Sequence, residues 1–356
     1  MNLPVAFLIA ALVCDSAFGA DARTPNVLIF YLDDMGYGDP ACYGGKLAPT
    51  PHIDSLATNG VRFTDGYVAA CVCAPSRVGL MTGRYQARTG HDANGGDLAP
   101  GEITIAQRMK AAGYATGIVG KWHLGSGPQS LPVARGFDFS IGSVGNLGNE
   151  GVKTGFYRGA ELMPELAGAP ITSPVYAREA CGFIERSHDR PWFLYLAFNA
   201  VHNPNVASES VLARLPQLKR RERDYAASIA EADDAIGTVL GKVRALSLED
   251  NTLIFCISDN GDSSPFANRE GLRGHKWLVW EGGIRVPWLV QWKSRIPAGR
   301  VLGTPVIQLD VLPTALAAAG VEPRPEWGLA GANLLPLLDR GREGRLNSAS
   351  PPSEPD

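Results

Sequence analysis

The chain has 356 residues, of which 45% are hydrophobic and 19% are charged, so it is long enough to bury a substantial core. Its formal net charge is -3 and its pI is near 6.1. A strong basic excess is typical of proteins that bind polyanions, so this charge balance excludes nucleic-acid binding as the main function. Any specificity for an anion must therefore come from a local group of residues.

The N-terminus carries an apolar run over residues 3–13, which is followed by small residues. This pattern predicts a secretory signal peptide at residues 1–22 and hence a secreted or periplasmic protein. The run is shorter than the roughly 20 residues that a membrane span needs, so we expect no stable membrane insertion. No Asn-x-Ser/Thr acceptor occurs in the chain, which favours a bacterial source and makes a lysosomal location unlikely.

Short apolar runs alternate with amphipathic stretches along the rest of the chain. The apolar runs predict buried strands at Val27–Leu32, Ala115–Val119, Trp192–Phe198 and Leu253–Ser258. The amphipathic stretches predict helices at Ile103–Ala112, Ser173–Ile184 and Arg223–Leu246, the last with Asp233 and Asp234 on its polar side. This alternation predicts an α/β fold, a doubly wound and mainly parallel sheet with helices on both faces.

Two further segments complete the predicted organisation. The Gly- and Asn-rich segment 142–159 is typical of a loop, and the polar residues 338–356 are typical of a disordered tail. Residues 23–337 then form one catalytic domain. Six cysteines occur in the chain without a readable disulfide framework, and Cys256, inside an apolar run, is expected to be a buried free thiol.

Polar and charged residues follow the predicted strands, at the edge where ligands bind in open α/β sheets. Each of them alone has an ordinary explanation as a turn, cap or packing residue. Their joint occurrence indicates a site, in which the oxygen-bearing side chains suit a hard cation such as Ca²⁺ and the others supply cations or titratable groups. The oxygen donors are Asp33, Asp34, Asp259 and Asn260, and the other residues are Lys121, His123 and His202.

The most specific motif is the string from Cys73 to Arg84, CAPSRVGLMTGR. Pro75 can open a helix, which would place the Cys73 side chain near a helix N-terminus, where backbone N–H groups favour an anion. Arg77 lies one turn later. A buried cysteine beside an ordinary helix cap would explain Cys-x-x-Ser alone, but it does not explain the full spaced string.

This string resembles the C-x-P-S-R-x-x-L-x-T-G-R signature of the type I sulfatases, which include the arylsulfatases. Other stretches between about residue 25 and about residue 337 are similar to the same family. They are Pro25–Asp39, Thr50–Asp54, Gly120–Gly125, Ser258–Gly261, Leu272–Lys276 and Glu281–Pro287.

The resemblance implies the alkaline-phosphatase-like sulfatase fold and hydrolysis of sulfate esters of a small molecule or glycan. It implies that a formylglycine-generating enzyme converts Cys73 to formylglycine, whose hydrated aldehyde attacks sulfur. It also implies one Ca²⁺ ion, bound by Asp33, Asp34, Asp259, Asn260 and an oxygen of the modified residue 73. The residues implied to hold the nucleophile and the sulfate are Arg77, Lys121, His123, His202 and Lys276.

These residue types fit the chemistry that the resemblance implies. The cations offset charge on the sulfuryl oxygens, His202 or Lys276 protonates the leaving alcohol, and His123 takes a proton from the second hydroxyl of residue 73 so that sulfate is expelled. A sulfated carbohydrate or an aryl sulfate is the expected substrate. Ser143 is the candidate for a serine with which some relatives contact the substrate.

The chain departs from the family in one respect, and two alternatives to an active sulfatase stay open. Relatives usually have a C-terminal subdomain, an antiparallel sheet with a packed helix, which we expect to be truncated here. The first alternative is therefore a catalytically inactive relative that binds sulfated ligands. The second is a hydrolase of the same fold that acts on phosphate or phosphonate esters.

Overall fold

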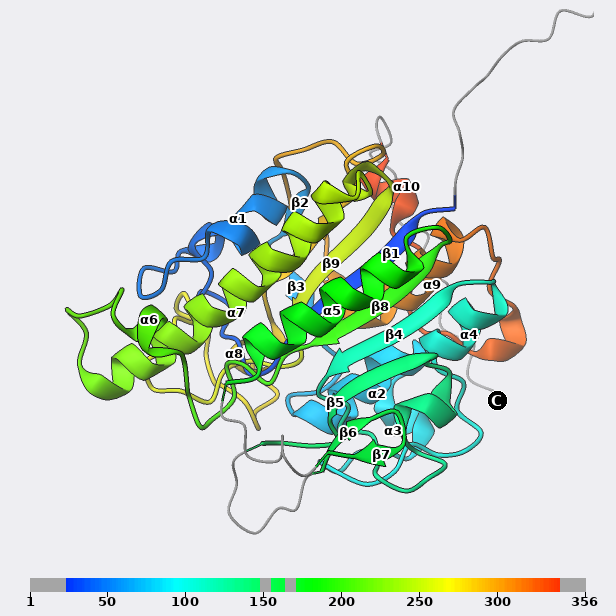
Figure 1. The fold of residues 1–356 in the computed structure, drawn as a ribbon, viewed down its shortest axis with the longest axis horizontal. Helices are drawn as coiled ribbons and strands as arrows, with labels where there is room; N and C mark the ends of the chain where they lie inside the picture. Colours follow the sequence, from blue (N-terminus) through cyan, green and yellow to red (C-terminus); the bar gives the residue numbers. More distant parts are fainter. Residues whose placement is uncertain (1–23, 148–154, 164–170, 340–356) are drawn as a thin grey trace, which may run out of the picture.

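The computed structural model of the protein describes residues 24–147, 155–163 and 171–339 (Figure 1). The predicted signal peptide lies outside these residues. So does the predicted tail, except for Leu338 and Asp339, at the end of the last helix. No helix in the described part of the chain is long and apolar enough to cross a membrane.

The centre of the molecule is a ten-stranded mixed sheet with the strand order β11-β2-β10-β9-β1-β8-β4-β5-β6-β7. Its strands are β1 (Asn26–Leu32), β2 (Val61–Phe63), β4 (Ala115–Gly120), β5 (Phe139–Ser143), β6 (Phe156–Arg158), β7 (Glu161–Leu162), β8 (Trp192–Ala197), β9 (Thr252–Ser258), β10 (Trp288–Gln291) and β11 (Arg300–Leu302). A separate two-stranded sheet pairs β3 (Gly66–Tyr67) with β12 (Val306–Ile307).

The four predicted strands are β9, β1, β8 and β4, which lie next to one another and are all parallel. Every residue in these four strands is buried, as expected for strands with helices on both faces. Their register is continuous: Leu32 pairs with Ser258, Tyr31 with Ala197, and Ala197 with Gly120. The residues that follow the four strands therefore start from one edge of the sheet.

Helices cover both faces of the sheet, and each face has its own hydrophobic core (Figure 1). One core includes residues of α1 (Pro51–Thr58), α5 (Ser173–Ser187), α6 (Glu209–Leu212) and α7 (Arg220–Ala245). The other includes residues of α2 (Cys73–Thr82), α4 (Ile105–Ala111), α9 (Val311–Ala318) and α10 (Leu335–Leu338). The described residues also contain two short α-helices, α3 (Gln86–Thr89) and α8 (Glu281–Ile284). The doubly wound α/β prediction is confirmed.

Three local predictions need correction. The segment 142–159 is not wholly a loop, because its ends belong to β5 and β6, while residues 148–154 lie outside the described residues. Helix α5 begins at Ser173, as predicted, but it extends to Ser187, beyond the predicted end at Ile184. Asp233 is not on the polar side of α7: it is fully buried, because it accepts hydrogen bonds from backbone N–H groups of α1.

The cysteine prediction is confirmed for Cys256, which is buried and free. The other described cysteines, Cys42, Cys71, Cys73 and Cys181, are also free thiols. No disulfide therefore links the described cysteines, and the sheet and its two cores hold this part of the chain together.

Candidate active site

The candidate site lies at the carboxyl edge of the four parallel strands. Asp33 and Asp34 follow β1, Asp259 and Asn260 follow β9, and Lys121 follows β4. The chain still follows the strand register here, because the Asp259 N–H donates to the Leu32 carbonyl (2.9 Å) and the Lys121 N–H donates to the Ala197 carbonyl (2.7 Å). The order of the strands thus brings together residues that are far apart in the sequence.

Gly120 makes the close approach of two strand ends possible. Its φ of 113° lies in the region that favours glycine. A Cβ at this position would lie 1.8 Å from the Ala197 carbonyl oxygen, so no other residue fits between β4 and β8. The next residue is Lys121, whose side chain is fully buried in the site.

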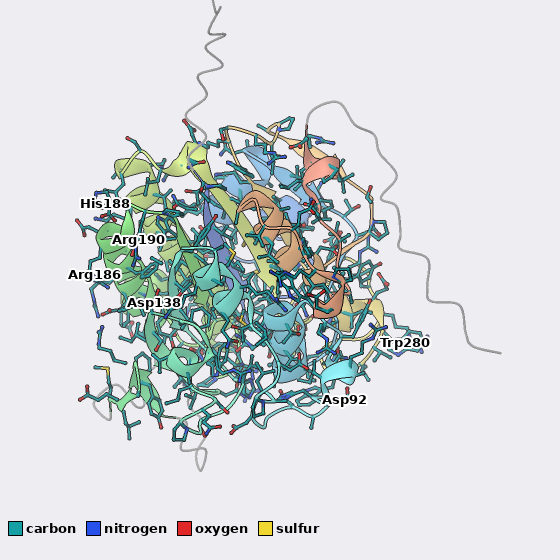
Figure 2. The ribbon with its side chains drawn as sticks, turned by 90° about the vertical axis from the view of Figure 1, so that its right-hand side faces the viewer. Asp92, Asp138, Arg186, His188, Arg190 and Trp280 are labelled. Carbon is teal, nitrogen blue, oxygen red and sulfur yellow. The ribbon has the colours of Figure 1, made fainter. Side chains whose placement is uncertain are left out.

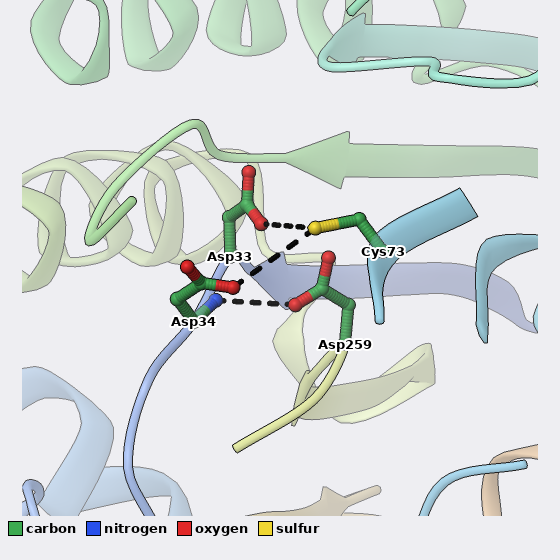
Figure 3. Close-up of side chains that lie close together, drawn as sticks. All are labelled: Asp33, Asp34, Cys73 and Asp259. Atoms are coloured by element: carbon green, nitrogen blue, oxygen red, sulfur yellow. Dashed lines mark hydrogen bonds between the residues drawn. The ribbon is translucent and has the colours of Figure 1, made fainter. Parts of the chain in front are cut away.

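Cys73 is the first residue of α2 and points into the acidic cluster (Figure 3). Its Sγ donates to Asp33 Oδ1 at 3.3 Å and lies 3.9 Å from Asp34 Oδ1. Ligand atoms of Asp33, Asp34, Cys73 and Asp259 all lie within 4.8 Å of one another, and all four residues are buried. The expectation that the Cys73 side chain lies at a helix N-terminus agrees with this placement.

Asp34 and Asn260 complete the oxygen-rich group. Asp34 has a φ of 62°, an uncommon conformation for a residue other than glycine, and its N–H donates to Asp259 Oδ1 (3.1 Å). The Asn260 Nδ2 group donates to Asp34 Oδ1 at 2.7 Å, while the buried Asn260 Oδ1 has no hydrogen-bond partner.

Three buried cations surround these carboxylates. Lys121 Nζ forms an ion pair with Asp33, and Lys276 Nζ lies 2.7 Å from Asp34 Oδ1. Arg77 donates through Nη2 to Asp259 Oδ2 (2.8 Å) and through Nη1 to the Lys121 carbonyl (3.1 Å). Because each cation has a carboxylate partner, three positive and three negative side chains can share this buried volume.

The two histidines lie at different depths. His202 is close to the carboxylates, with Nε2 3.8 Å from Asp34 Oδ2, and its Nδ1 donates to the Asn203 carbonyl (2.7 Å). His123 has a φ of 62°, and its buried Nδ1 has no partner. Burial, together with the positive charges of Lys121 and Arg77, lowers the pKa of His123 to about 2. His123 is therefore neutral at physiological pH.

The carboxylates and Cys73 respond differently to burial. For Asp33, burial raises the pKa, but Lys121, His202 and Arg77 outweigh it and hold the pKa well below its usual range. Burial and repulsion from Asp33 raise the pKa of Asp259 to about 7. Burial and the Asp33 charge also raise the pKa of the Cys73 thiol well above its ordinary value. The unmodified cysteine is thus a neutral thiol, a weak nucleophile.

The donor set fits a hard divalent cation. The cluster offers carboxylate oxygens and one sulfur as ligand atoms. The unpartnered Asn260 Oδ1 is a buried acceptor that a cation would satisfy. A divalent cation would also lower the pKa of Asp259, because it stabilises the ionised carboxylate.

Sequence reasoning missed several residues that support the site. Ser263 Oγ donates to Asp34 Oδ2 (3.0 Å), Asn94 Oδ1 accepts from the Ala74 N–H (3.0 Å), and the Tyr195 hydroxyl accepts from Arg77 (3.2 Å). Ser263 could have been suspected from its place three residues after Asn260. Ser143 instead hydrogen-bonds Asn199, whose Nδ2 donates to its Oγ (3.2 Å).

Comparison with known proteins identifies the class of enzyme. The Sulfatase family model matches residues 25–321. N-acetylgalactosamine-6-sulfatase of Sus scrofa is 35% identical over 354 residues, which cover 90% of this chain and 67% of that protein. Arylsulfatase A of Homo sapiens is also 35% identical, with 95% of this chain and 72% of that protein covered. The chain belongs to the sulfatase family, whose members hydrolyse sulfuric esters.

Solved structures give the same result for the fold. The crystal structure of Ps i-CgsB in complex with k-i-k-neocarrahexaose has a TM-score of 0.83 and 33% identity, covering 88% of this chain and 76% of that one. The prediction of an alkaline-phosphatase-like sulfatase fold is confirmed. A phosphonate monoester hydrolase of Agrobacterium radiobacter, at 20% identity and a TM-score of 0.61, is alike in fold alone.

Proposed function

We propose that this chain hydrolyses the sulfate ester of a sulfated carbohydrate, using a formylglycine made from Cys73 and one bound Ca²⁺ ion. The observation that carries the proposal is the position of Cys73: its Sγ lies 3.3 Å from Asp33 Oδ1, at the start of α2 and inside the acidic cluster. The raised pKa of the thiol supports modification, because an unmodified Cys73 would be a poor nucleophile.

Asp33, Asp34, Asp259 and Asn260 would hold the Ca²⁺ ion, together with an oxygen of the modified residue 73. Their oxygen atoms and the unpartnered Asn260 Oδ1 support this assignment. When bound, the ion would supply positive charge against the charge that develops on the sulfuryl oxygens.

The remaining site residues have roles that their surroundings support. Arg77, Lys121 and Lys276 would bind the sulfate and offset its charge. His123 would accept a proton from residue 73, because burial and the nearby positive charges keep its ring unprotonated beforehand. Asp34 raises the pKa of Lys276 above its usual value against the effect of burial, so Lys276 retains its proton and His202 is the better donor to the leaving alcohol.

The names of the relatives support a sulfated glycan as the substrate, since one is an N-acetylgalactosamine-6-sulfatase and a similar structure was solved in complex with k-i-k-neocarrahexaose. The proposal also requires a formylglycine-generating enzyme as a partner during maturation. Export to a secreted or periplasmic location stays a prediction, because residues 1–22 lie outside the described residues.

The test is to produce the protein together with a formylglycine-generating enzyme. Mass spectrometry of the tryptic peptide with residue 73 should show the aldehyde, and the protein should release sulfate from 4-nitrocatechol sulfate. Cys73→Ser should abolish this activity. Cys71→Ser is a matched control, because Cys71 is a half-buried free thiol two residues earlier, and it should stay active.

Two results would contradict the proposal. Full turnover by the Cys73→Ser variant would point to another nucleophile. A fully modified protein that releases no sulfate from any ester, but binds sulfated saccharides, would instead fit a non-catalytic relative.

A further inference from the structure

The loop Trp277–Trp280 exposes four large apolar side chains in a row, directly after Lys276. Their exposed fractions are 60% for Trp277, 39% for Leu278, 78% for Val279 and 48% for Trp280. Figure 2 shows Trp280 projecting from the surface of the molecule. The other exposed large hydrophobic side chains in the described ranges stand singly along the chain. A contiguous exposed apolar patch is typical of a binding surface.

Backbone hydrogen bonds hold this loop in one conformation. The Trp277 N–H donates to the Cys71 carbonyl (3.0 Å), the Leu278 N–H to the His275 carbonyl (3.0 Å), and the Gly283 N–H to the Trp280 carbonyl (2.7 Å). Trp277 has a φ of 75°, which is costly for a bulky residue and is often found at functional sites. The backbone that carries the two tryptophans is therefore held in a defined conformation.

The loop is continuous with the proposed active site. Lys276 Nζ lies 2.7 Å from Asp34 Oδ1 and 5.7 Å from the centroid of the Trp277 ring. The backbone bond from Trp277 reaches Cys71, two residues before Cys73. A sulfate ester held by Lys276 would thus lie next to the Trp277 ring.

A positively charged side chain lies beside one of the aromatic rings. The Arg273 guanidinium lies over the Trp280 ring, 4.0 Å from its centroid, and both Arg273 and His275 belong to the exposed surface. The surface therefore offers flat apolar faces next to a guanidinium group. A sulfated saccharide has the complementary chemistry, because its sugar rings have apolar C–H faces and its substituents carry negative charge.

We propose that Trp277 stacks against the sugar ring that carries the sulfate ester, and that Trp280 with Arg273 receives the next part of the saccharide. This inference rests on the proposed sulfate-ester hydrolysis and adds the feature that recognises the leaving group. A lipid surface is the less favoured occupant, because the loop directly follows Lys276, whose ammonium group contacts the Asp34 carboxylate of the proposed site.

The test measures binding without turnover, in full-length chains that carry Cys73→Ala and with Ca²⁺ present. The probes are N-acetylgalactosamine 6-sulfate, which has a ring, and ethyl sulfate, which has the same charge and no ring. Trp277→Ala should weaken binding of the sugar sulfate about three- to tenfold, the range that aromatic contacts typically supply. Ethyl sulfate should bind the variant and the parent chain equally.

Two variants control for indirect effects. Trp277→Phe keeps an aromatic ring and should retain most of the affinity for the sugar sulfate. Val279→Ala changes the same loop without removing a ring and should bind both probes as the parent does. The indole fluorescence of the parent should shift when the sugar sulfate binds, and this shift should be lost in Trp277→Ala.

Several outcomes would overturn the inference. Trp277→Ala could lose affinity for both probes equally, or its affinity for the sugar sulfate could be unchanged. The parent chain could also fail to bind the sugar sulfate. Binding of anionic lipid vesicles through Trp277 and Trp280, with no effect on the sugar sulfate, would favour the lipid surface instead. Turnover of 4-nitrocatechol sulfate by the mature protein reports separately on the proposed function.

Discussion

Arg77 connects α2 to the strands and their ends by four contacts. Besides its bonds to Asp259 and the Lys121 carbonyl, it donates to the Tyr195 hydroxyl and lies over the Tyr31 ring. A planar guanidinium can make these contacts at once, whereas an ammonium group of the same charge has a different shape and reach. The residue type, and not only its charge, is therefore needed at this position.

Arg77→Lys should lower both stability and activity. We expect the free energy of unfolding to fall by about 1–3 kcal/mol, because buried partners of the guanidinium lose their hydrogen bonds. Sulfate-ester turnover should fall at least about 100-fold, as for other losses of a positioned charge. Urea denaturation and turnover of 4-nitrocatechol sulfate measure the two effects.

Arg84→Lys is the matched control. Arg84 lies just beyond α2 and pairs with Glu102 at 2.7 Å, but this pair is partly exposed, so its loss should cost less than about 1 kcal/mol. Equal effects of the two substitutions would contradict the role assigned to Arg77.

Ser263→Ala tests a residue that contacts a proposed metal ligand without binding the metal. Its hydroxyl donates to Asp34 Oδ2, and loss of such a bond typically weakens metal binding about 10-fold or more. Calorimetric titration with Ca²⁺ should show this decrease, and Ser210→Ala on α6 should not. An unchanged Ca²⁺ affinity in Ser263→Ala would show that the bond does not position Asp34.

At the level of the elements, Asp233 of α7 caps α1. Its carboxylate accepts from the His52 N–H (3.1 Å) and the Ile53 N–H (2.7 Å), in the first turn of α1. With His52 and Asp234 it forms a second group of possible metal ligands. The hydrogen bonds to the α1 backbone explain the position of the Asp233 carboxylate, and Asp234 forms an ion pair with Arg214. The group is therefore explained as a junction between α1 and α7.

Asp233→Asn should change how stability depends on pH. Burial raises the pKa of Asp233 to about 7 from 3.8, so the folded protein binds this proton more tightly than the unfolded chain does. The stability that Asp233 contributes is therefore fully present below about pH 4 and is lost as the pH rises through about 7. The wild-type unfolding free energy should fall relative to that of Asp233→Asn over this range.

Denaturant unfolding at several pH values measures this difference. Asp234→Asn serves as the control, since Asp234 is the next residue but is partly exposed and paired with Arg214. A difference between wild type and Asp233→Asn that does not vary with pH would be inconsistent with a raised pKa.

At the scale of the whole molecule, the site joins one face of the sheet to its central strands. Cys73 comes from a helix on one face, Asp33 and Asp259 from central strands, and Lys276 from the segment between β9 and β10. A cation would bind among these residues only when the chain is folded, because the unfolded chain does not bring them together. Its binding free energy would therefore add to the free energy of unfolding.

Ca²⁺ should accordingly stabilise the protein. At a free concentration 100 times its Kd, one bound ion adds about 2.7 kcal/mol to the free energy of unfolding. Thermal or urea unfolding with Ca²⁺ and with a chelator should show this difference, and Asp259→Asn should reduce it. If chelation left the stability and the activity of the mature protein unchanged, the calcium assignment would be wrong.

The sequence by itself determined the α/β class, the four central strands and the family, because buried parallel strands form unbroken apolar runs and the Cys73–Arg84 string has a fixed spacing. Tertiary structure decided what local pattern cannot encode: which strands are neighbours, which carboxylate meets which cation, and that Asp233 is buried while Asp234 is not. The physical reason is that such contacts join residues up to 242 positions apart, as between Asp34 and Lys276. The spacing of residues within one segment carries no information about a partner so distant in the chain.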